Sequence, residues 1–134
     1  MFTVAFAVAF ALPAFAAAVL SNWSYYGPVN GVTYENRSET NNNVVMTAVI
    51  AVRGKNSATM PAGWAALQGT LYRNGSACKT GDYYYTTSDL KSISRVAATK
   101  NCGTGNYTTR GSTGAYNGND YDWYYTAKSP ILVN

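Results

Sequence analysis

Short runs of alternating apolar and polar residues, separated by turn residues, fill most of the chain beyond its first twenty positions. The strongest run is 44–53, VVMTAVIAVR, where Met46 and Ile50 share one face and Val45 and Val49 share the other. Because both faces are largely apolar, the pattern predicts a central strand that is covered on both sides. A helix is the alternative, but β-branched side chains disfavour it because they lose rotamer freedom there.

Two further runs predict strands next to turns. Residues 64–73 alternate and lead into Asn74-Gly75, the favoured centre of a type I′ hairpin because Asn and Gly both tolerate positive φ. We expect a return strand directly after this turn. Residues 32–39 also alternate, but only the first part of that run has an apolar face. The strand is therefore expected to fray toward Ser38.

The C-terminal stretch 102–130 is rich in glycine, and we expect its glycines to divide it into short pieces that carry aromatic residues. Within this stretch, strict alternation places Tyr121, Trp123 and Tyr125 on one face of a strand that follows an Asn-Gly turn. The whole chain shows about seven short strands with frequent turn signals. This organisation predicts an all-β fold, a small antiparallel β-sandwich or barrel.

The first eighteen residues, MFTVAFAVAFALPAFAAA, have a different pattern: a compact apolar run, a proline and then small residues. This is typical of a secretory signal peptide and its cleavage site, although no Lys or Arg precedes the run. We therefore expect a signal peptide at 1–18 and a single secreted β domain at 19–134, with cleavage after Ala16 or Ala18. An uncleaved membrane anchor over 2–20 and a buried helix are the alternatives.

Export changes how the two cysteines are interpreted. Cys78 and Cys102 are the only cysteines, and in an exported chain such a pair is expected to form a disulfide rather than remain as two buried thiols. The bridge would close a loop of about 25 residues and stabilise the fold by roughly 3–4 kcal/mol. Zinc binding is not expected, because a zinc site needs four ligands and the chain has no histidine.

The net charge of the chain indicates which kinds of partner it can attract. Ten Lys and Arg against six Asp and Glu give a net charge of +4. The cations are scattered and form no patch or stripe in the sequence, so a nucleic-acid partner is not expected. A mildly basic exported protein is instead attracted to anionic surface polymers. We expect contact with a membrane only through an uncleaved signal segment.

The absence of histidine removes the usual general base and the usual metal ligand. Asp120 and Asp122 could form the carboxylate pair of a glycosidase, since alternate strand residues lie about 7 Å apart. Together with Asn117 and Asn119 they also offer oxygen ligands for calcium. The same residues are typical of a turn, where short polar side chains bond the backbone. We expect the turn rather than either site. Because the chain has no histidine and only six carboxylates, we expect no enzyme activity, catalytic residue, bound metal or cofactor.

After these exclusions, the aromatic side chains are the residues left that could form a functional surface. Twelve Tyr and three Trp exceed what the core of so short a chain needs. A Tyr side chain combines a flat apolar ring with a polar tip, which suits an exposed contact surface, whereas cross-strand pairing on a sheet surface is the alternative explanation. We expect a secreted, non-enzymatic protein that binds a cell-wall glycan or an anionic surface polymer. The candidate contact residues are Tyr83, Tyr85, Tyr121, Trp123 and Tyr125.

The second half of the chain resembles a group of small exported proteins of Gram-positive bacteria with no established function. The matching segments are GTLY at 69–72 before Asn74-Gly75, CGTGNY at 102–107, AYNGNDY at 115–121 and KSP at 128–130. This resemblance implies a single-disulfide all-β domain behind a signal peptide. The chain also resembles lactococcin-type secreted β-sandwich bacteriocins in WSY at 23–25, AGWA at 62–65 and YYY at 83–85. That likeness implies an alternative function, an antagonistic factor acting on neighbouring cells.

Overall fold

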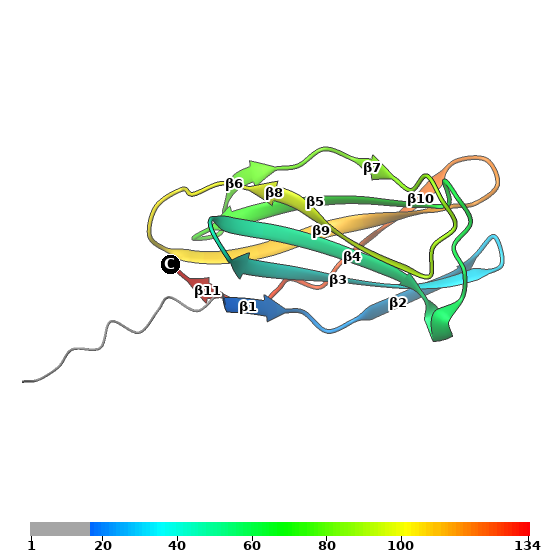
Figure 1. Ribbon diagram of the computed structural model, residues 1–134, viewed down its shortest axis with the longest axis horizontal. Coiled ribbons are helices and arrows are strands. Elements are labelled where there is room, and N and C mark those ends of the chain that lie inside the picture. Colours follow the sequence, from blue (N-terminus) through cyan, green and yellow to red (C-terminus); the bar gives the residue numbers. More distant parts are fainter. Residues whose placement is uncertain (1–16) are drawn as a thin grey trace, which may run out of the picture.

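A computed structural model describes residues 17–134 as two antiparallel β-sheets packed face to face (Figure 1). The all-β prediction is confirmed, and of the two expected arrangements the chain forms the sandwich. It contains eleven strands within residues 17–134, several of them only two to five residues long, rather than about seven. The elements are β1 (Ala17–Leu20), β2 (Ser24–Val29), β3 (Val32–Asn42), β4 (Met46–Gly54), the 3₁₀ turn η1 (Lys55–Ser57), β5 (Ala65–Arg73), β6 (Ser76–Thr80), β7 (Tyr84–Tyr85), β8 (Ser92–Thr99), β9 (Asn106–Tyr116), β10 (Tyr121–Tyr125) and β11 (Leu132–Val133).

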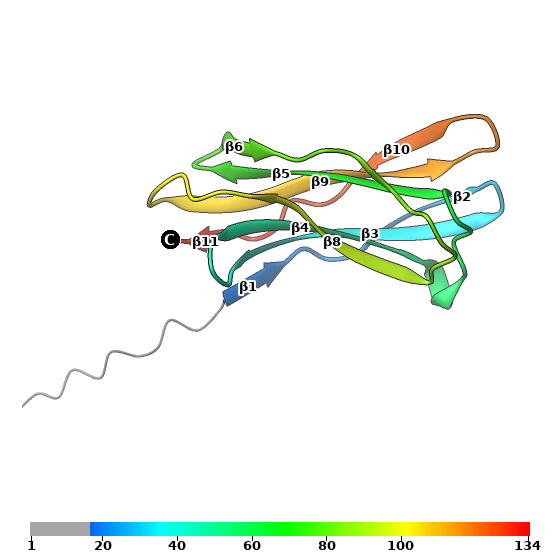
Figure 2. The same ribbon diagram turned by 45° about the horizontal axis from the view of Figure 1, so that its top comes forward.

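The two sheets are separate layers in Figure 2. In the first, which we name sheet 1, β1 and β2 both pair with β3, and the order continues through β4 to β8. In the second, sheet 2, β10 and β11 both pair with β9, and β9 pairs with β5, which carries β6 and β7 on its other side. The central strands of the two layers are therefore β3 and β4 in sheet 1 and β5 and β9 in sheet 2.

Two of the three Asn-Gly turns that join neighbouring strands in residues 17–134 have the backbone expected of type I′ hairpins. Asn74 and Gly75, between β5 and β6, have φ of 49° and 81°. Asn30 and Gly31, between β2 and β3, have φ of 49° and 83°. The hairpin predicted at Asn74-Gly75 is confirmed, because its positive φ values give the turn the twist of the strands that it connects.

Strand β4 lies between β3 and β8, as the apolar run predicts, and its inward side chains are buried. Ile50 of β4 packs against two glycines that face it from sheet 2. A Cβ atom on Gly69 would lie 2.6 Å from Cγ1 of Ile50, and one on Gly111 would lie 2.5 Å from its Cδ1. The expectation that glycines divide 102–130 into short pieces is therefore wrong for β9: it runs unbroken over eleven residues because Gly111 makes room for a side chain from the opposite layer.

Strand β3 does not fray at Ser38, as its loss of apolar pattern suggested. Ser38 and Thr40 are fully buried and point into the sandwich. The Thr40 hydroxyl lies 2.7 Å from that of Thr109 and 2.8 Å from that of Ser129, while Ser38 donates to the Ala127 carbonyl. Buried polar groups are tolerated where they are hydrogen-bonded. Strand β9 and the segment after β10 supply these partners, so a polar inward face is compatible with a regular strand.

Three tyrosines form a stack inside the sandwich, which we name the inner stack. Tyr26 lies parallel to Tyr124, with ring centroids 4.0 Å apart, and to Tyr34, at 5.5 Å. The Tyr26 hydroxyl is hydrogen-bonded to Thr113, whereas the Tyr34 hydroxyl is buried without a hydrogen-bond partner in the protein. Burial raises the pKa of Tyr34 to about 12 and also raises the pKa of Tyr26.

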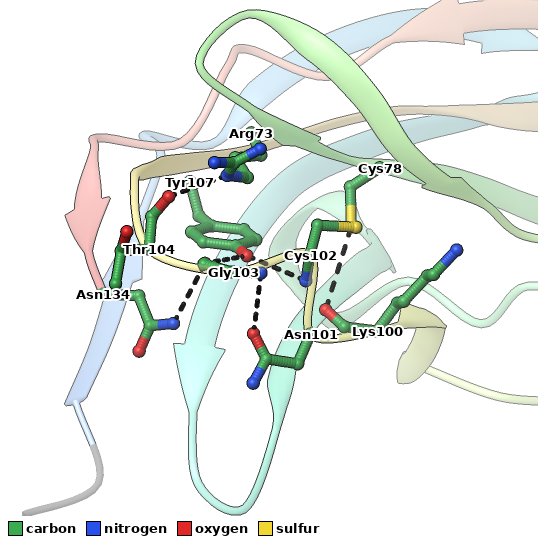
Figure 3. The surroundings of a disulfide bond; sticks show 9 residues. All are labelled: Arg73, Cys78, Lys100, Asn101, Cys102, Gly103, Thr104, Tyr107 and Asn134. Atoms are coloured by element: carbon green, nitrogen blue, oxygen red, sulfur yellow. Dashed lines mark hydrogen bonds between the residues drawn. A yellow bond between two sulfur atoms is a disulfide. The ribbon is translucent and has the colours of Figure 1, made fainter.

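The predicted disulfide between Cys78 and Cys102 is present and joins β6 to the loop between β8 and β9 (Figure 3). Beside it, the Tyr107 hydroxyl accepts a hydrogen bond from the backbone N–H of Cys102 and donates one to the Gly103 carbonyl at 2.6 Å. The bridge borders a small apolar cluster that includes Leu71. A disulfide is typical of proteins that leave the reducing cytoplasm, which agrees with the expected location.

The predicted signal peptide at 1–18 lies outside the described residues except for its last two positions. Ala17 and Ala18 begin β1 and pair with Asn42 and Asn41 of β3. Among residues 17–134 there is no helix with the length and apolar character needed to cross a membrane.

Candidate binding face

The outer surface of sheet 2 brings together aromatic side chains that are far apart in the sequence. Strand alternation turns Tyr121, Trp123 and Tyr125 of β10 outward and Tyr124 inward, onto the inner stack. Tyr83 and Tyr85 come from β7 and the residue before it, on the other side of β5 and β9. All five predicted contact residues therefore lie on one face of the sandwich.

Four of these rings contact one another, and we name them the outer cluster: Tyr83, Tyr85, Tyr121 and Trp123. Tyr83 meets Trp123 edge to face, with centroids 5.1 Å apart and planes at 70°. Tyr85 meets Tyr121 in the same way, at 5.2 Å and 62°. The ring centroids of Tyr121 and Trp123 lie 6.2 Å apart, so these two residues connect the two pairs. Edge-to-face packing is a favourable geometry for aromatic rings, so the cluster holds its own shape.

The outer cluster spans two central strands because those strands carry small residues beneath it. Trp123 pairs with Gly114 of β9, Gly114 with Ala66 of β5, and Ala66 with Tyr85 of β7. A Cβ atom on Gly114 would lie 3.1–3.2 Å from three atoms of the Trp123 ring. The indole therefore rests directly on the backbone of β9, and large rings from both flanks reach toward each other over a floor of Gly114 and Ala66.

Tyr121 anchors the cluster rather than presenting a free surface. Its side chain is half-buried, and its hydroxyl donates a hydrogen bond to the Gly63 carbonyl. Burial and the neighbouring Tyr85 raise the pKa of Tyr121. The other four residues are more open: Tyr83 is 61% exposed, Tyr85 46%, Trp123 39% and Tyr125 73%.

These open side chains surround a shallow hollow of about 450 Å³. Small-molecule sites in proteins are commonly apolar hollows of roughly 300–1,000 Å³ with a few polar groups. The wall residues are Tyr83, Tyr85, Ser112, Trp123 and Tyr125. The hollow thus offers flat apolar walls together with hydroxyl groups that can donate or accept hydrogen bonds.

Sequence reasoning missed the small and charged residues of this face. Ser112 and Gly114 belong to a glycine-rich stretch that gave no sign of where its residues would point. Arg110 lies two positions before Ser112 on the same side of β9, and its guanidinium carbon is 4.6 Å from the centroid of Tyr125. Had 106–116 been predicted as one strand, the alternation of side chains would have placed Ser112 and Arg110 on the same face as Gly114.

Asp120 lies in the turn between β9 and β10, and Asp122 is the second residue of β10; both are exposed and bonded to Asn117 or the local backbone. The Asn117 carbonyl oxygen of the side chain accepts from the backbone N–H groups of Asn119 and Asp120, each at 2.9 Å. Its amide donates to Asp122 at 3.0 Å. In residues 17–134 no three His, Cys, Asp or Glu side chains gather as a metal-binding group. The geometry is that of a turn stabilised by side chains.

The outer face of sheet 1 has aromatic residues too, and cations lie against their rings. The guanidinium carbons of Arg37 and Arg53 lie 4.4 Å and 3.8 Å from the centroid of Trp23. Arg53 is also bonded to Glu35 at 2.8 Å, the only ion pair among residues 17–134. Lys55 lies 4.7 Å from the centroid of Tyr25. The hollow beside Trp23, of about 560 Å³, is lined mostly by charged and polar residues, whereas four of the five wall residues of the hollow on sheet 2 are aromatic.

Comparison with known proteins gives no assignment. No protein-family model matches the chain, and neither a curated protein sequence nor a solved structure is similar to it.

Proposed function

We propose that the chain is an exported, non-enzymatic protein that binds a glycan of a cell wall or cell surface through the outer face of sheet 2. The observation that carries the proposal is the hollow between Tyr83, Tyr85, Trp123 and Tyr125, which is built on a floor of small residues and is open to solvent. The apolar stretch at 1–18 and the disulfide between Cys78 and Cys102 support export.

Sugar rings fit this kind of surface for a chemical reason. A pyranose presents C–H groups on its flat faces and hydroxyl groups around its rim. The faces pack against aromatic rings, while the rim needs hydrogen-bond partners near the ring edge. Trp123 and Tyr85 provide ring surfaces, and the hydroxyls of Ser112 and the tyrosines lie around the hollow. Preorganised rings also lose little conformational entropy on binding.

The positive charge has a secondary role in this proposal. A net charge of +4 attracts the chain to anionic wall polymers at low ionic strength, but salt screens interactions between exposed charges beyond about 10 Å at 0.1 M. Contacts made by the aromatic hollow would persist in salt. Salt resistance therefore separates binding by the hollow from general attraction by charge.

Retention on isolated cell walls tests the proposal. The purified, disulfide-bonded chain is mixed with walls of Gram-positive bacteria, sedimented and washed with 1 M salt. We expect the chain to stay in the pellet after the wash, and Trp123→Ala or Tyr83→Ala to reduce the retained amount at least tenfold. Tyr25→Ala is the matched control, because Tyr25 is 72% exposed but lies on sheet 1.

Two results would overturn the proposal. Wild-type protein that washes off with salt has no contact beyond charge. Variants of the outer cluster that are retained as well as Tyr25→Ala place the contact elsewhere. If the wild-type chain does not bind walls at all, growth inhibition of related strains becomes the relevant assay for the bacteriocin-like alternative.

A further inference from the structure

The hollow at the outer cluster continues along β9. A second hollow, of about 200 Å³, shares Tyr125 with the first and lies next to it on the same face. Its wall residues are Gln68, Thr70, Tyr72, Arg110, Gly111 and Tyr125. Since Gln68 pairs with Ser112 and Thr70 with Arg110, the second hollow occupies the next positions along the two central strands.

A third hollow, of about 450 Å³, follows at the far end of β9. Thr108 and Lys128 line it, and Thr108 lies two positions before Arg110 on the same side of the strand. From Gly114 to Thr108 the strand extends about 20 Å. The outer face of sheet 2 therefore offers three hollows in a row, which is a shape suited to an extended ligand.

Charge is distributed unevenly along this row. Arg110 and Lys128 are exposed cations at the second and third hollows. Neither belongs to the only ion pair of residues 17–134. Two carboxylates, Asp120 and Asp122, lie at the opposite, aromatic end beside Tyr121, whereas Asp82 lies between β6 and β7 at the edge of the sheet. The row is thus aromatic at one end and cationic beyond Tyr125.

Arg110 keeps donors available for a ligand. Its guanidinium stacks near the Tyr125 ring, which restrains the side chain, yet stacking leaves the N–H groups at the rim of the guanidinium plane. A guanidinium presents five donors in a fork that matches a carboxylate or phosphate. The side chain is therefore held in position by one aromatic ring and still lacks an anionic partner.

We propose that the ligand is a linear acidic glycan that lies along β9, with a sugar ring at the outer cluster and an acidic group on Arg110. This inference rests on the proposed function and narrows it, because it names the charge of the glycan and its direction on the sheet. A polymer without sugar rings would leave the outer cluster unused, and a neutral glycan would leave Arg110 and Lys128 without partners.

A matched pair of oligosaccharides tests the inference. Cellohexaose is neutral, and its C6-oxidised counterpart carries a carboxylate on each ring with the same backbone. Affinities for the purified chain are measured by calorimetry at 50 mM and 500 mM salt. We expect the acidic hexamer to bind at least tenfold more tightly at low salt, with the preference shrinking at high salt. Trp123→Ala should weaken the binding of both hexamers.

Arg110→Gln provides the decisive variant. We expect it to reduce the preference for the acidic hexamer to less than threefold, because the affinity for the acidic hexamer should fall far more than the affinity for cellohexaose. Arg37→Gln is the control, because Arg37 also stacks on an aromatic ring but lies on sheet 1. A thermal melt of each variant verifies that the fold is intact.

The outcomes separate this inference from the proposed function. Equal binding of both hexamers, lost in Trp123→Ala, overturns the acidic preference and leaves glycan binding standing. An acidic preference that Arg110→Gln retains and Arg37→Gln loses moves the charged contact to sheet 1. Poly(glycerol phosphate) bound as tightly as the acidic hexamer, and equally by Trp123→Ala, shows that charge alone is recognised. If neither hexamer binds but the chain is still retained on walls in high salt, the acidic-glycan inference is rejected and wall binding stands.

Discussion

On the inner side of sheet 2, Tyr124 stacks parallel on Tyr26 with centroids 4.0 Å apart, whereas on the outer side Trp123 meets Tyr83 edge to face at 5.1 Å. Trp123 and Tyr124 are consecutive residues of β10. The inner rings are covered by the opposite sheet, and the outer rings are supported from below by Gly114 but left open above. The same strand therefore contributes to the core on one side and to a contact surface on the other.

Exposed aromatic side chains alone therefore do not mark a binding surface. Trp23 and Tyr25 on sheet 1 are partly or largely exposed as well, but Arg53 and Lys55 lie against their rings. The outer cluster differs in having a floor of small residues and a hollow between its rings. Substitutions on each side of sheet 2 should therefore have separate effects, on stability for the inner stack and on binding for the outer cluster.

Removing the centre of the inner stack should have the largest effect. Tyr26→Ala deletes a ring that contacts both Tyr34 and Tyr124 and also removes the hydrogen bond to Thr113. We expect the free energy of unfolding, measured with urea, to fall by about 3–5 kcal/mol. Tyr26→Phe, which keeps the ring, should cost only about 1 kcal/mol. Equal losses in the two variants would contradict a role for ring packing.

Removing the disulfide should be nearly as costly but leave the outer cluster unchanged. The bridge closes a loop with a sequence separation of 24 residues, so Cys78→Ser combined with Cys102→Ser should lower the free energy of unfolding by about 3–4 kcal/mol. Wall retention of the folded double variant should stay within twofold of wild type, because the bridge lies at the opposite end of the sandwich. Loss of retention in a variant with an intact β-sheet circular dichroism spectrum would show that the two ends depend on each other.

Replacing one tryptophan on each outer face with alanine tests the difference between the two faces. Trp123→Ala should weaken wall binding at least tenfold, which corresponds to about 1.4 kcal/mol. Trp23→Ala removes a ring of similar size that contacts Arg37 and Arg53, and it should reduce stability while leaving wall binding unchanged. Parallel titrations of both variants on isolated walls give the answer. A larger binding loss in Trp23→Ala would assign the contact to sheet 1.

Deleting one hydroxyl from the inner stack should have the smallest effect, and it should stabilise the fold. The Tyr34 hydroxyl is buried without a partner in the protein, so Tyr34→Phe should raise the free energy of unfolding by about 1 kcal/mol at pH 7.5. Urea denaturation at several pH values measures this difference. A loss of stability in Tyr34→Phe would mean that the hydroxyl has a partner after all.

The same variant has a signature at alkaline pH. Because the pKa of Tyr34 is about 12 in the fold and near 10 for an exposed tyrosine, ionisation favours the unfolded chain once the pH exceeds 10. The stability that the un-ionised Tyr34 hydroxyl contributes is fully present below pH 10 and is lost as the pH rises toward 12. The advantage of Tyr34→Phe should therefore grow by about 1 kcal/mol between pH 9 and pH 11. An advantage that does not change with pH would contradict the raised pKa.

Local patterns were sufficient for features that depend on neighbours in the sequence. The hairpin at Asn74-Gly75, the central position of β4 and the shared face of Tyr121, Trp123 and Tyr125 all follow from turn chemistry or a period of two. The disulfide followed from the expectation of export. In each case the deciding residues lie within a few positions of one another, or are the only ones of their kind.

Features that depend on distant partners could not be predicted in the same way. Strand β3 continues through Thr40 because Thr109 and Ser129 bond to it, and these lie 69 and 89 positions away. Tyr83 reaches Trp123 only because β5 and β9 lie between their strands with small residues at the crossing. The position of Arg110 on this face follows from the same pairing of β5 with β9. Strand order, rather than local propensity, decides these contacts.

Both ends of the described chain lie at the same end of the sandwich, away from the outer cluster. Ala17 opens β1, Asn134 follows β11, and Figure 1 shows these two strands beside each other at the end that holds the disulfide. A fluorescent label, an affinity handle or a second protein fused at Asn134 would therefore project away from Trp123. Fixed to a sensor chip by that end, the molecule would display its aromatic hollow to the solution, in a single orientation on every copy.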